Sequence, residues 1–104
     1  MARPLDLLLA TALVVAASCA QAGDRAGELT ALVREDCGSC HGMTLKGGLG
    51  APLLPGDLEG KDAASLAAII LDGVPGTPMP PWRGLLSEAD ARWIAERLKQ
   101  GLPQ

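Results

Sequence analysis

The stretch EDCGSCHGM, residues 35–43, holds the pattern on which the fold depends. Cys37 and Cys40 stand two residues apart, and His41, the only histidine of the chain, follows directly. Four kinds of site use such a cysteine pair: a disulfide, half of a zinc site, a redox dithiol and a haem attachment site. The remainder of the sequence decides between them.

Three of these interpretations are disfavoured. A disulfide between Cys37 and Cys40 closes too short a loop to stabilise a fold much. A zinc site needs four ligands, and beyond residue 22 the chain has no other cysteine and no second histidine. A thioredoxin-like dithiol belongs beside a strand–helix unit, which the sequence lacks. The C-x-x-C-H pattern therefore predicts one covalently attached haem c, with a thioether from each thiol and His41 on the iron.

The second axial ligand of that iron is predicted to be Met79. Met43 is only two residues from His41, and two residues of extended chain span at most ~7 Å, too little to reach the opposite face of a haem. Met79 lies in the segment TPMPPW, where three prolines restrict the backbone and so reduce the entropy lost on fixing the sulfur. A Met/His-ligated iron is saturated and suited to electron transfer.

Four further residues allow two interpretations each, and one of the two is a role near the haem. The Pro52 carbonyl either accepts a hydrogen bond from the free ring nitrogen of His41 or belongs to a simple turn. Trp82 packs on the haem or anchors a loop. Arg83 and Lys46 either neutralise the haem propionates or are merely solvated.

Apolar periodicity predicts three helices and no sheet. The first begins near Asp24 and runs to about Cys37, the second covers residues 63–73 after an Asp62 cap, and the third follows Ser87. Ser87 and Asp90 form a capping-box pattern, and Glu88 is expected to pair with Arg92 on the helix surface. Trp93 is expected to pack the third helix on the first.

The composition fits a small all-α domain that needs a cofactor. The chain has 104 residues, with two Trp and no Phe or Tyr. So small a domain buries only a marginal core, and a large flat apolar ring would replace the missing aromatic side chains. The net charge of −3 and the lack of a basic block exclude a nucleic-acid footprint.

Residues 1–22 have the layout of a secretory signal peptide. Arg3 precedes the apolar run of residues 7–17, and Ala20-Gln21-Ala22 resembles a cleavage site. The run is short for a membrane span, so no span is expected in the mature chain, residues 23–104. Cys19 leaves lipid attachment open. Export agrees with haem attachment outside the cytoplasm and predicts a periplasmic protein.

The segment CGSCHG and the proline-flanked Met79 resemble a class I monohaem c-type cytochrome, although Val33 stands where that family usually has an aromatic. CGSCHGMTLKGGLGAPLLP and GTPMPPWRGLLSEADARWIAERLKQGLP are similar to the NirC-type cytochromes of denitrification gene clusters. The resemblance implies an all-α fold in which N- and C-terminal helices cross and loops surround the haem. It assigns haem binding to Cys37, Cys40, His41 and Met79. It also implies service to a cytochrome cd-type nitrite reductase, as electron donor or in maturation of its haem d-type cofactor.

The function predicted from these features is that of a monomeric carrier of single electrons, not an enzyme, which meets its redox partner transiently. Three alternatives remain: a small haem enzyme, a ligand-binding haem module with an open sixth position, and a subunit of a larger oxidase or reductase. A haem enzyme needs a distal acid–base group, and the chain has no second histidine to supply it.

Overall fold

The computed structural model describes residues 24–103, and the predicted leader and Cys19 lie outside them. The described part is helical and contains no strand, which confirms the all-α expectation. A first helix covers residues 24–32 and continues as a π-helical turn, η1 (Val33–Cys37), into α2 (Gly38–His41). The short 3-10 helix η2 (Pro55–Leu58) follows, and then α3 (Ala63–Asp72) and α4 (Glu88–Gln100).

The π turn carries the haem-type motif on the end of the first helix. The Gly38 N–H donates to the Val33 carbonyl, five residues back, instead of the usual four. The extra residue in this turn rotates Cys40 and His41 relative to the buried stripe of Leu29 and Val33. The sequence predicts one regular helix ending near Cys37; the helical backbone instead runs on to His41 and changes its period on the way.

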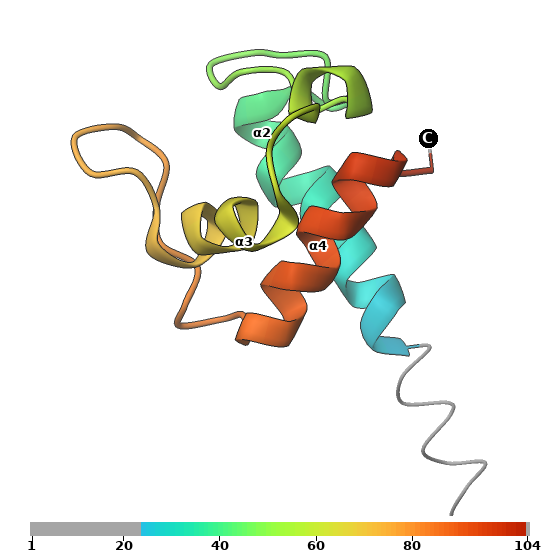
Figure 1. The fold of residues 1–104 in the computed structure, drawn as a ribbon, viewed down its shortest axis with the longest axis vertical. Helices are drawn as coiled ribbons and strands as arrows, with labels where there is room; N and C mark the ends of the chain where they lie inside the picture. The colour runs from blue at the N-terminus through green and yellow to red at the C-terminus, as the bar shows by residue number, and fades with distance from the viewer. Residues whose placement is uncertain (1–23, 104) are drawn as a thin grey trace, which may run out of the picture.

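The core forms where the first helix crosses α4, with α3 packed against the side of α4 (Figure 1). Small buried residues of α4, Ala91 and Ala95, let the helix backbones approach closely, and Ile94 is almost fully buried between them. Trp93 lines a groove with Leu29 and Ala26, so it lies between the first helix and α4 as expected. The other buried apolar residues are Leu29, Val33, Leu45, Leu58, Ala67, Leu71, Leu86, Leu98 and Leu102.

Both later helices begin at the predicted caps. The Asp62 side chain accepts a hydrogen bond from the Ser65 N–H at 2.8 Å, and Gly73 follows the last residue of α3. Ser87 and Asp90 form the predicted reciprocal capping box of α4. The predicted pair of Glu88 with Arg92 is wrong.

Arg92 bonds instead to Glu96 at 2.9 Å, and Glu88 lies 3.6 Å from Arg83. An exposed i, i+4 ion pair contributes only a few tenths of a kcal/mol. Arg92 can therefore pair with Glu88 or with Glu96 at almost the same free energy.

No helix within residues 24–103 has the length and apolar character needed to cross a membrane.

Candidate functional site

One wall of the site is the loop of residues 42–53, which folds back over α2. The Gly50 N–H donates to the Cys40 carbonyl at 2.7 Å, and the Gly47 N–H donates to the His41 carbonyl at 2.9 Å. This return brings Gly50 against the imidazole, where a Cβ would lie 2.8 Å from His41 Cε1 and Nδ1. Only glycine fits there without moving the ring.

The loop also fixes the orientation of the His41 ring. Nδ1 lies 2.7 Å from the carbonyl oxygen of Ala51. The carbonyl can only accept, so Nδ1 carries the proton and Nε2 is left free as a ligand. The acceptor expected at Pro52 is thus one residue off: Pro52 is exposed, and the preceding carbonyl is the one that faces the ring.

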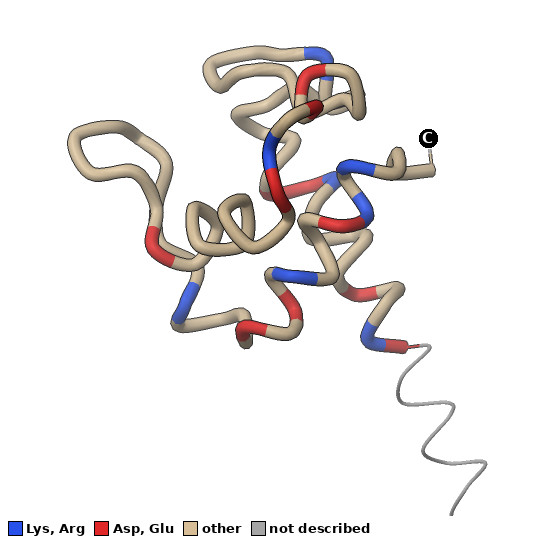
Figure 2. The backbone as a smooth tube through the Cα atoms, in the orientation of Figure 1, with Lys and Arg blue, Asp and Glu red and all other residues tan. Residues whose placement is uncertain are grey.

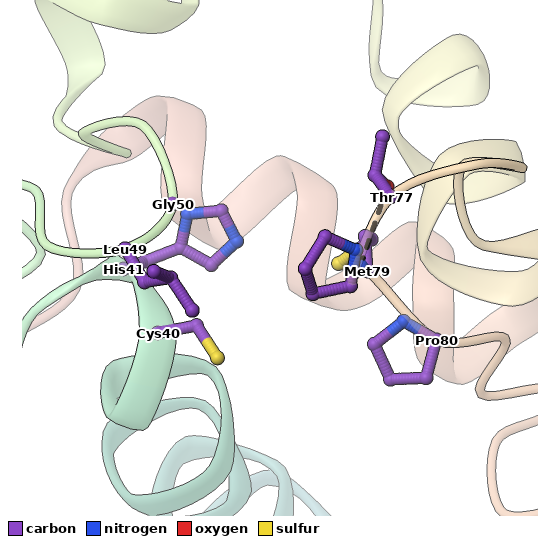
Figure 3. A pocket seen from close by; sticks show the side chains of 8 residues that line it. Cys40, His41, Leu49, Gly50, Thr77, Met79 and Pro80 are labelled. Carbon is purple, nitrogen blue, oxygen red and sulfur yellow. Dashed lines mark hydrogen bonds between the residues drawn. The ribbon is translucent and has the colours of Figure 1, made fainter.

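The opposite wall is the loop after α3, which is held in shape by its own hydrogen bonds. The Val74 N–H donates to the Met79 carbonyl at 3.2 Å and closes the loop. The Thr77 hydroxyl donates to the Val74 carbonyl at 2.7 Å and accepts from the Met79 N–H at 3.3 Å. These hydrogen bonds fix the backbone of Met79 within the loop (Figure 3).

This second loop is also tied to the end of α3. The Trp82 N–H donates to the carbonyls of Ile70 and Leu71, each at 3.1 Å. Gly73 has φ +68°, and a Cβ on it would lie 2.7 Å from the Met79 carbonyl oxygen. The methionine loop thus rests directly on the helix terminus.

The two walls enclose a cavity of about 170 Å³. Cys40, His41, Leu49 and Gly50 line it from one side, and residues 77–80 line it from the other. Figure 3 shows the imidazole and the Met79 side chain on opposite sides of this gap, with the Cys40 thiol below. The structure therefore brings His41 and Met79 together across one space, although they are far apart in the sequence.

The cleft extends beyond this cavity in two directions. An inner space of about 90 Å³ also touches His41 and Met79 and reaches the core. Apart from His41, its lining is apolar, including Leu53, Leu66, Ile69, Ile70, Ile94 and Leu98. A third space, of about 240 Å³, touches both Cys37 and Cys40 and is bounded by Trp82 and Pro80.

The residues present fit a haem c. Cys37 and Cys40 are both free thiols, and burial, followed by the nearby Asp36 charge, raises the pKa of the Cys37 thiol to about 11. The pair faces an apolar slot with a free imidazole nitrogen on one side and a thioether on the other. Within residues 24–103, His, Cys, Asp and Glu side chains nowhere gather in threes in a way that could hold a metal ion, so the zinc alternative gains no support.

The two cations considered for the propionates are placed differently. Arg83 is paired with Asp72 at 2.8 Å and lies along a groove between α3 and α4, away from the cleft. The structure thus favours the interpretation of Arg83 as an ordinary surface charge over a role in neutralising a haem propionate. Lys46 is exposed on the first loop. Met43 is 68% exposed and lines none of the three spaces.

Ala51 and Thr77 belong to the site but were not found from the sequence. Ala51 acts through its carbonyl, a group that every residue has, so no side-chain pattern could identify it. Thr77, two residues before Met79, carried a usable signal, since a threonine hydroxyl often bonds to the backbone of a nearby turn.

Comparison with known proteins places the chain among cytochromes. Residues 24–96 match the family described as cytochrome C oxidase, cbb3-type, subunit III. Cytochrome c55X of Paracoccus denitrificans is 54% identical over 94 residues, covering 86% of this chain and 91% of the relative. The solved structure of a c-type cytochrome NirC superposes with a TM-score of 0.73 at 54% identity, covering 75% of this chain and 92% of that one.

A longer protein contains a similar segment. Dihydro-heme d1 dehydrogenase of Pseudomonas aeruginosa is 40% identical over 85 residues, which is 82% of this chain and 17% of the relative. A solved structure of dihydro-heme d1 dehydrogenase NirN in complex with DHE gives a TM-score of 0.64 at 38% identity, covering 71% of this chain and 16% of the other.

Proposed function

The chain belongs to the monohaem c-type cytochromes, in the family of cytochrome c55X and NirC, and from this premise we propose that it carries single electrons in the periplasm. The haem c supplies a one-electron Fe(II)/Fe(III) couple when bound. In this proposal Cys37 and Cys40 hold it by two thioethers. His41 would bind the iron through Nε2, and Met79 would supply a second ligand from the opposite wall of the cavity.

The observation that carries the proposal is the placement of His41 and Met79 on opposite walls of one cavity. Met/His ligation saturates the iron and raises its potential, which suits electron transfer and leaves no position for a substrate. Both ligands are held by backbone contacts, the imidazole by the Ala51 carbonyl and Met79 by the closed loop of residues 74–79.

We propose nitrite reductase of the cytochrome cd type as the partner, either accepting electrons or requiring them for maturation of its haem d-type cofactor. The similarity of this chain to a segment of dihydro-heme d1 dehydrogenase supports the role in cofactor maturation. In that relative the similar segment is 17% of a much longer chain. The predicted signal peptide of residues 1–22 supports a periplasmic location.

The ligand assignment is tested by spectra of oxidised and reduced holoprotein, wild type against Met79→Ala. The wild type is expected to show the charge-transfer band of a methionine–iron bond in the oxidised state, and Met79→Ala is expected to lose it. Met43→Ala is the matched control, because Met43 is exposed and outside the cleft; it should keep the band.

The alternative function, a haem enzyme or ligand-binding module with an open sixth position, makes the opposite prediction. Wild-type protein would then lack the methionine band and bind carbon monoxide readily when reduced, and Met79→Ala would change neither property. That result would overturn the carrier proposal.

The partner is tested by mixing reduced cytochrome with a cd-type nitrite reductase in a stopped-flow instrument. Oxidation of the cytochrome within milliseconds to seconds, followed by nitrite-dependent turnover, is the expected result. Electron transfer to small inorganic oxidants but none to the reductase would refute the choice of partner while leaving the carrier role intact.

A further inference from the structure

One acidic residue borders the cleft on the side that holds the two thiols. Asp36 lines the space of about 240 Å³ that touches both Cys37 and Cys40. The outer cavity of about 170 Å³ and the inner space of about 90 Å³ are lined by no Lys, Arg, Asp or Glu. Among the residues that line these three spaces, Asp36 is therefore the one with a carboxylate charge.

The backbone holds Asp36 in a fixed place beside the thiols. Asp36 belongs to η1 and directly precedes Cys37. Its carbonyl accepts a hydrogen bond from the Ser39 hydroxyl at 2.7 Å, and Ser39 lines the same space. This bond ties Asp36 to the turn between the two cysteines, so its backbone cannot move independently of the motif.

No basic residue neutralises this carboxylate. Asp36 takes part in none of the ion pairs found in the described part of the chain. Arg83 is paired with Asp72 outside the cleft, and Lys46 lines none of the three spaces. Figure 2 shows no charged residue along the methionine loop, residues 73–82, whereas both signs of charge occur on the first helix.

The charge of Asp36 acts at the place where the haem would be attached. Burial and then the Asp36 charge raise the pKa of the Cys37 thiol to about 11. A carboxylate that disfavours a negative charge at this sulfur favours a positive charge in the same region. A haem has one more positive charge in the Fe(III) state than in the Fe(II) state. The carboxylate therefore stabilises the oxidised state more than the reduced state.

We propose that Asp36 tunes the reduction potential of this cytochrome: its carboxylate, beside the two thiols, lowers the midpoint potential and makes the protein a stronger electron donor. This inference rests on the proposed function, in which Cys37 and Cys40 hold the haem. Methionine ligation raises the potential, and an apolar cleft disfavours the extra charge of the oxidised state. Asp36 offsets part of both effects.

The midpoint potential of the holoprotein, measured by spectroelectrochemical titration, tests the role of Asp36. Asp36→Asn removes the charge and keeps the shape of the side chain. We expect its midpoint to lie above that of the wild type. The equilibrium constant for electron exchange with a fixed reference should change about two- to fivefold, equivalent to roughly 20–40 mV for a one-electron couple. Asp36→Lys should move the midpoint in the same direction about twice as far, and Asp36→Glu should keep the wild-type value.

Glu35→Gln is the matched control. Glu35 is the preceding residue of η1, is also exposed and lines none of the three spaces. Both variants remove one negative charge from the same helical turn, but only Asp36→Asn removes it from the cleft. We expect Glu35→Gln to change the equilibrium constant less than about 1.5-fold. Equal shifts in the two variants would show that the potential responds only to net charge and would overturn the proposal.

Salt separates an effect of charge from an effect of packing. Asp36 is exposed, so its field is screened when the ionic strength rises from about 10 mM to about 1 M. The difference in midpoint between wild type and Asp36→Asn should fall to less than about half over this range. A difference that stays constant would mean that the substitution altered the packing around the haem, and would refute the electrostatic role.

The absorption spectrum keeps this proposal distinct from the carrier function. If the wild type lacks the methionine–iron band while Asp36→Asn and Glu35→Gln differ in midpoint as expected, the carrier proposal is wrong and the role of Asp36 stands. If the band is present and the two variants have the same midpoint, the carrier proposal stands and the role of Asp36 is wrong.

Discussion

At the scale of single residues, the site depends on backbone groups as much as on side chains. The imidazole of His41 is oriented by the Ala51 carbonyl at 2.7 Å, and Gly50 provides the space that lets this carbonyl approach. Neither residue contributes side-chain chemistry. Their function is to hold a ring whose second nitrogen must point into the cleft.

We predict that Gly50→Ala moves the His41 ring. Because the new Cβ would lie 2.8 Å from two ring atoms, the loop or the imidazole must shift, at a cost of about 1–3 kcal/mol. The expected result is a lower denaturation midpoint of the holoprotein and an altered haem spectrum.

Gly56→Ala is the control for this variant, since a Cβ at Gly56 meets nothing within 4 Å. If both variants have the wild-type spectrum and stability, the close approach of Gly50 to His41 has no consequence and the prediction fails.

The candidate ligands could be predicted from the sequence because thiols, imidazole and thioether are rare and chemically specific. Their spacing added a geometric limit, which removed Met43 from consideration. The Ala51 carbonyl could not be predicted, because carbonyls are identical at every position and a shift of one residue along a loop leaves no trace in the sequence. For the same reason the Pro52 carbonyl, which the sequence offered as the acceptor for His41, is not the one that faces the ring.

At the scale of elements, Asp90 joins the start of α4 to the first helix. Its side chain accepts from the Ser87 N–H as part of the capping box and from Arg25 at 2.6 Å. The Arg25 hydrogen bond, despite an opposing effect of burial, lowers the pKa of Asp90 to about 2. The Asp90 side chain is only 14% exposed, so solvent screens this interaction less than it screens the other surface pairs.

We predict that Asp90→Asn lowers the free energy of unfolding by about 1–2 kcal/mol at neutral pH. The carboxylate is favoured in the folded state, so its contribution is fully present above the unfolded-state pKa of about 3.9. It is lost as the pH falls through the folded-state value of about 2. Denaturant titrations at pH 7 and between pH 4 and 2 measure both effects.

In this pH range the wild type should lose stability relative to Asp90→Asn, and the difference between the two proteins should shrink steadily towards pH 2. Glu96→Gln, which removes an exposed partner of Arg92, should cost at most a few tenths of a kcal/mol. A constant difference between wild type and Asp90→Asn down to pH 2 would contradict the assigned pKa.

Helix caps were predictable and the helix period was not. Asp62 and Ser87 each bond to the N–H three residues on, a local interaction that the sequence displays directly. The π turn of Val33–Cys37 satisfies two non-local demands: Val33 must reach the core and His41 must face the methionine loop. One extra residue in the turn reconciles the two directions, and no local propensity signals it.

At the scale of the whole molecule, the hydrophobic core borders the inner cavity of the cleft. The described chain has no aromatic side chain among its buried residues, and the inner cavity lies between α3, α4 and the Cys37 thiol at the end of η1. The small buried residues of α4 bring the helices together, but the methionine loop, which is bonded to the end of α3, is separated from the His41 loop by the cleft. A haem in this space would join the two walls.

We predict that the haem-free protein is poorly folded. The Cys37→Ala, Cys40→Ala double variant, produced without attached haem, should lose most of its helical circular dichroism at 222 nm or unfold without a cooperative transition. The Met79→Ala holoprotein is the control, because it keeps the attached haem and should remain helical. A haem-free protein with a wild-type dichroism spectrum and a sharp thermal transition would contradict the prediction.

The order of the two walls along the chain has a consequence for biogenesis. The motif and its loop are complete by residue 53, whereas the methionine wall follows α3, to which its backbone is bonded. In an exported chain the thiols would cross the membrane before their covering wall. Attachment would therefore take place on an open, unfinished polypeptide, and the later arrival of residues 77–80 would seal the haem in place.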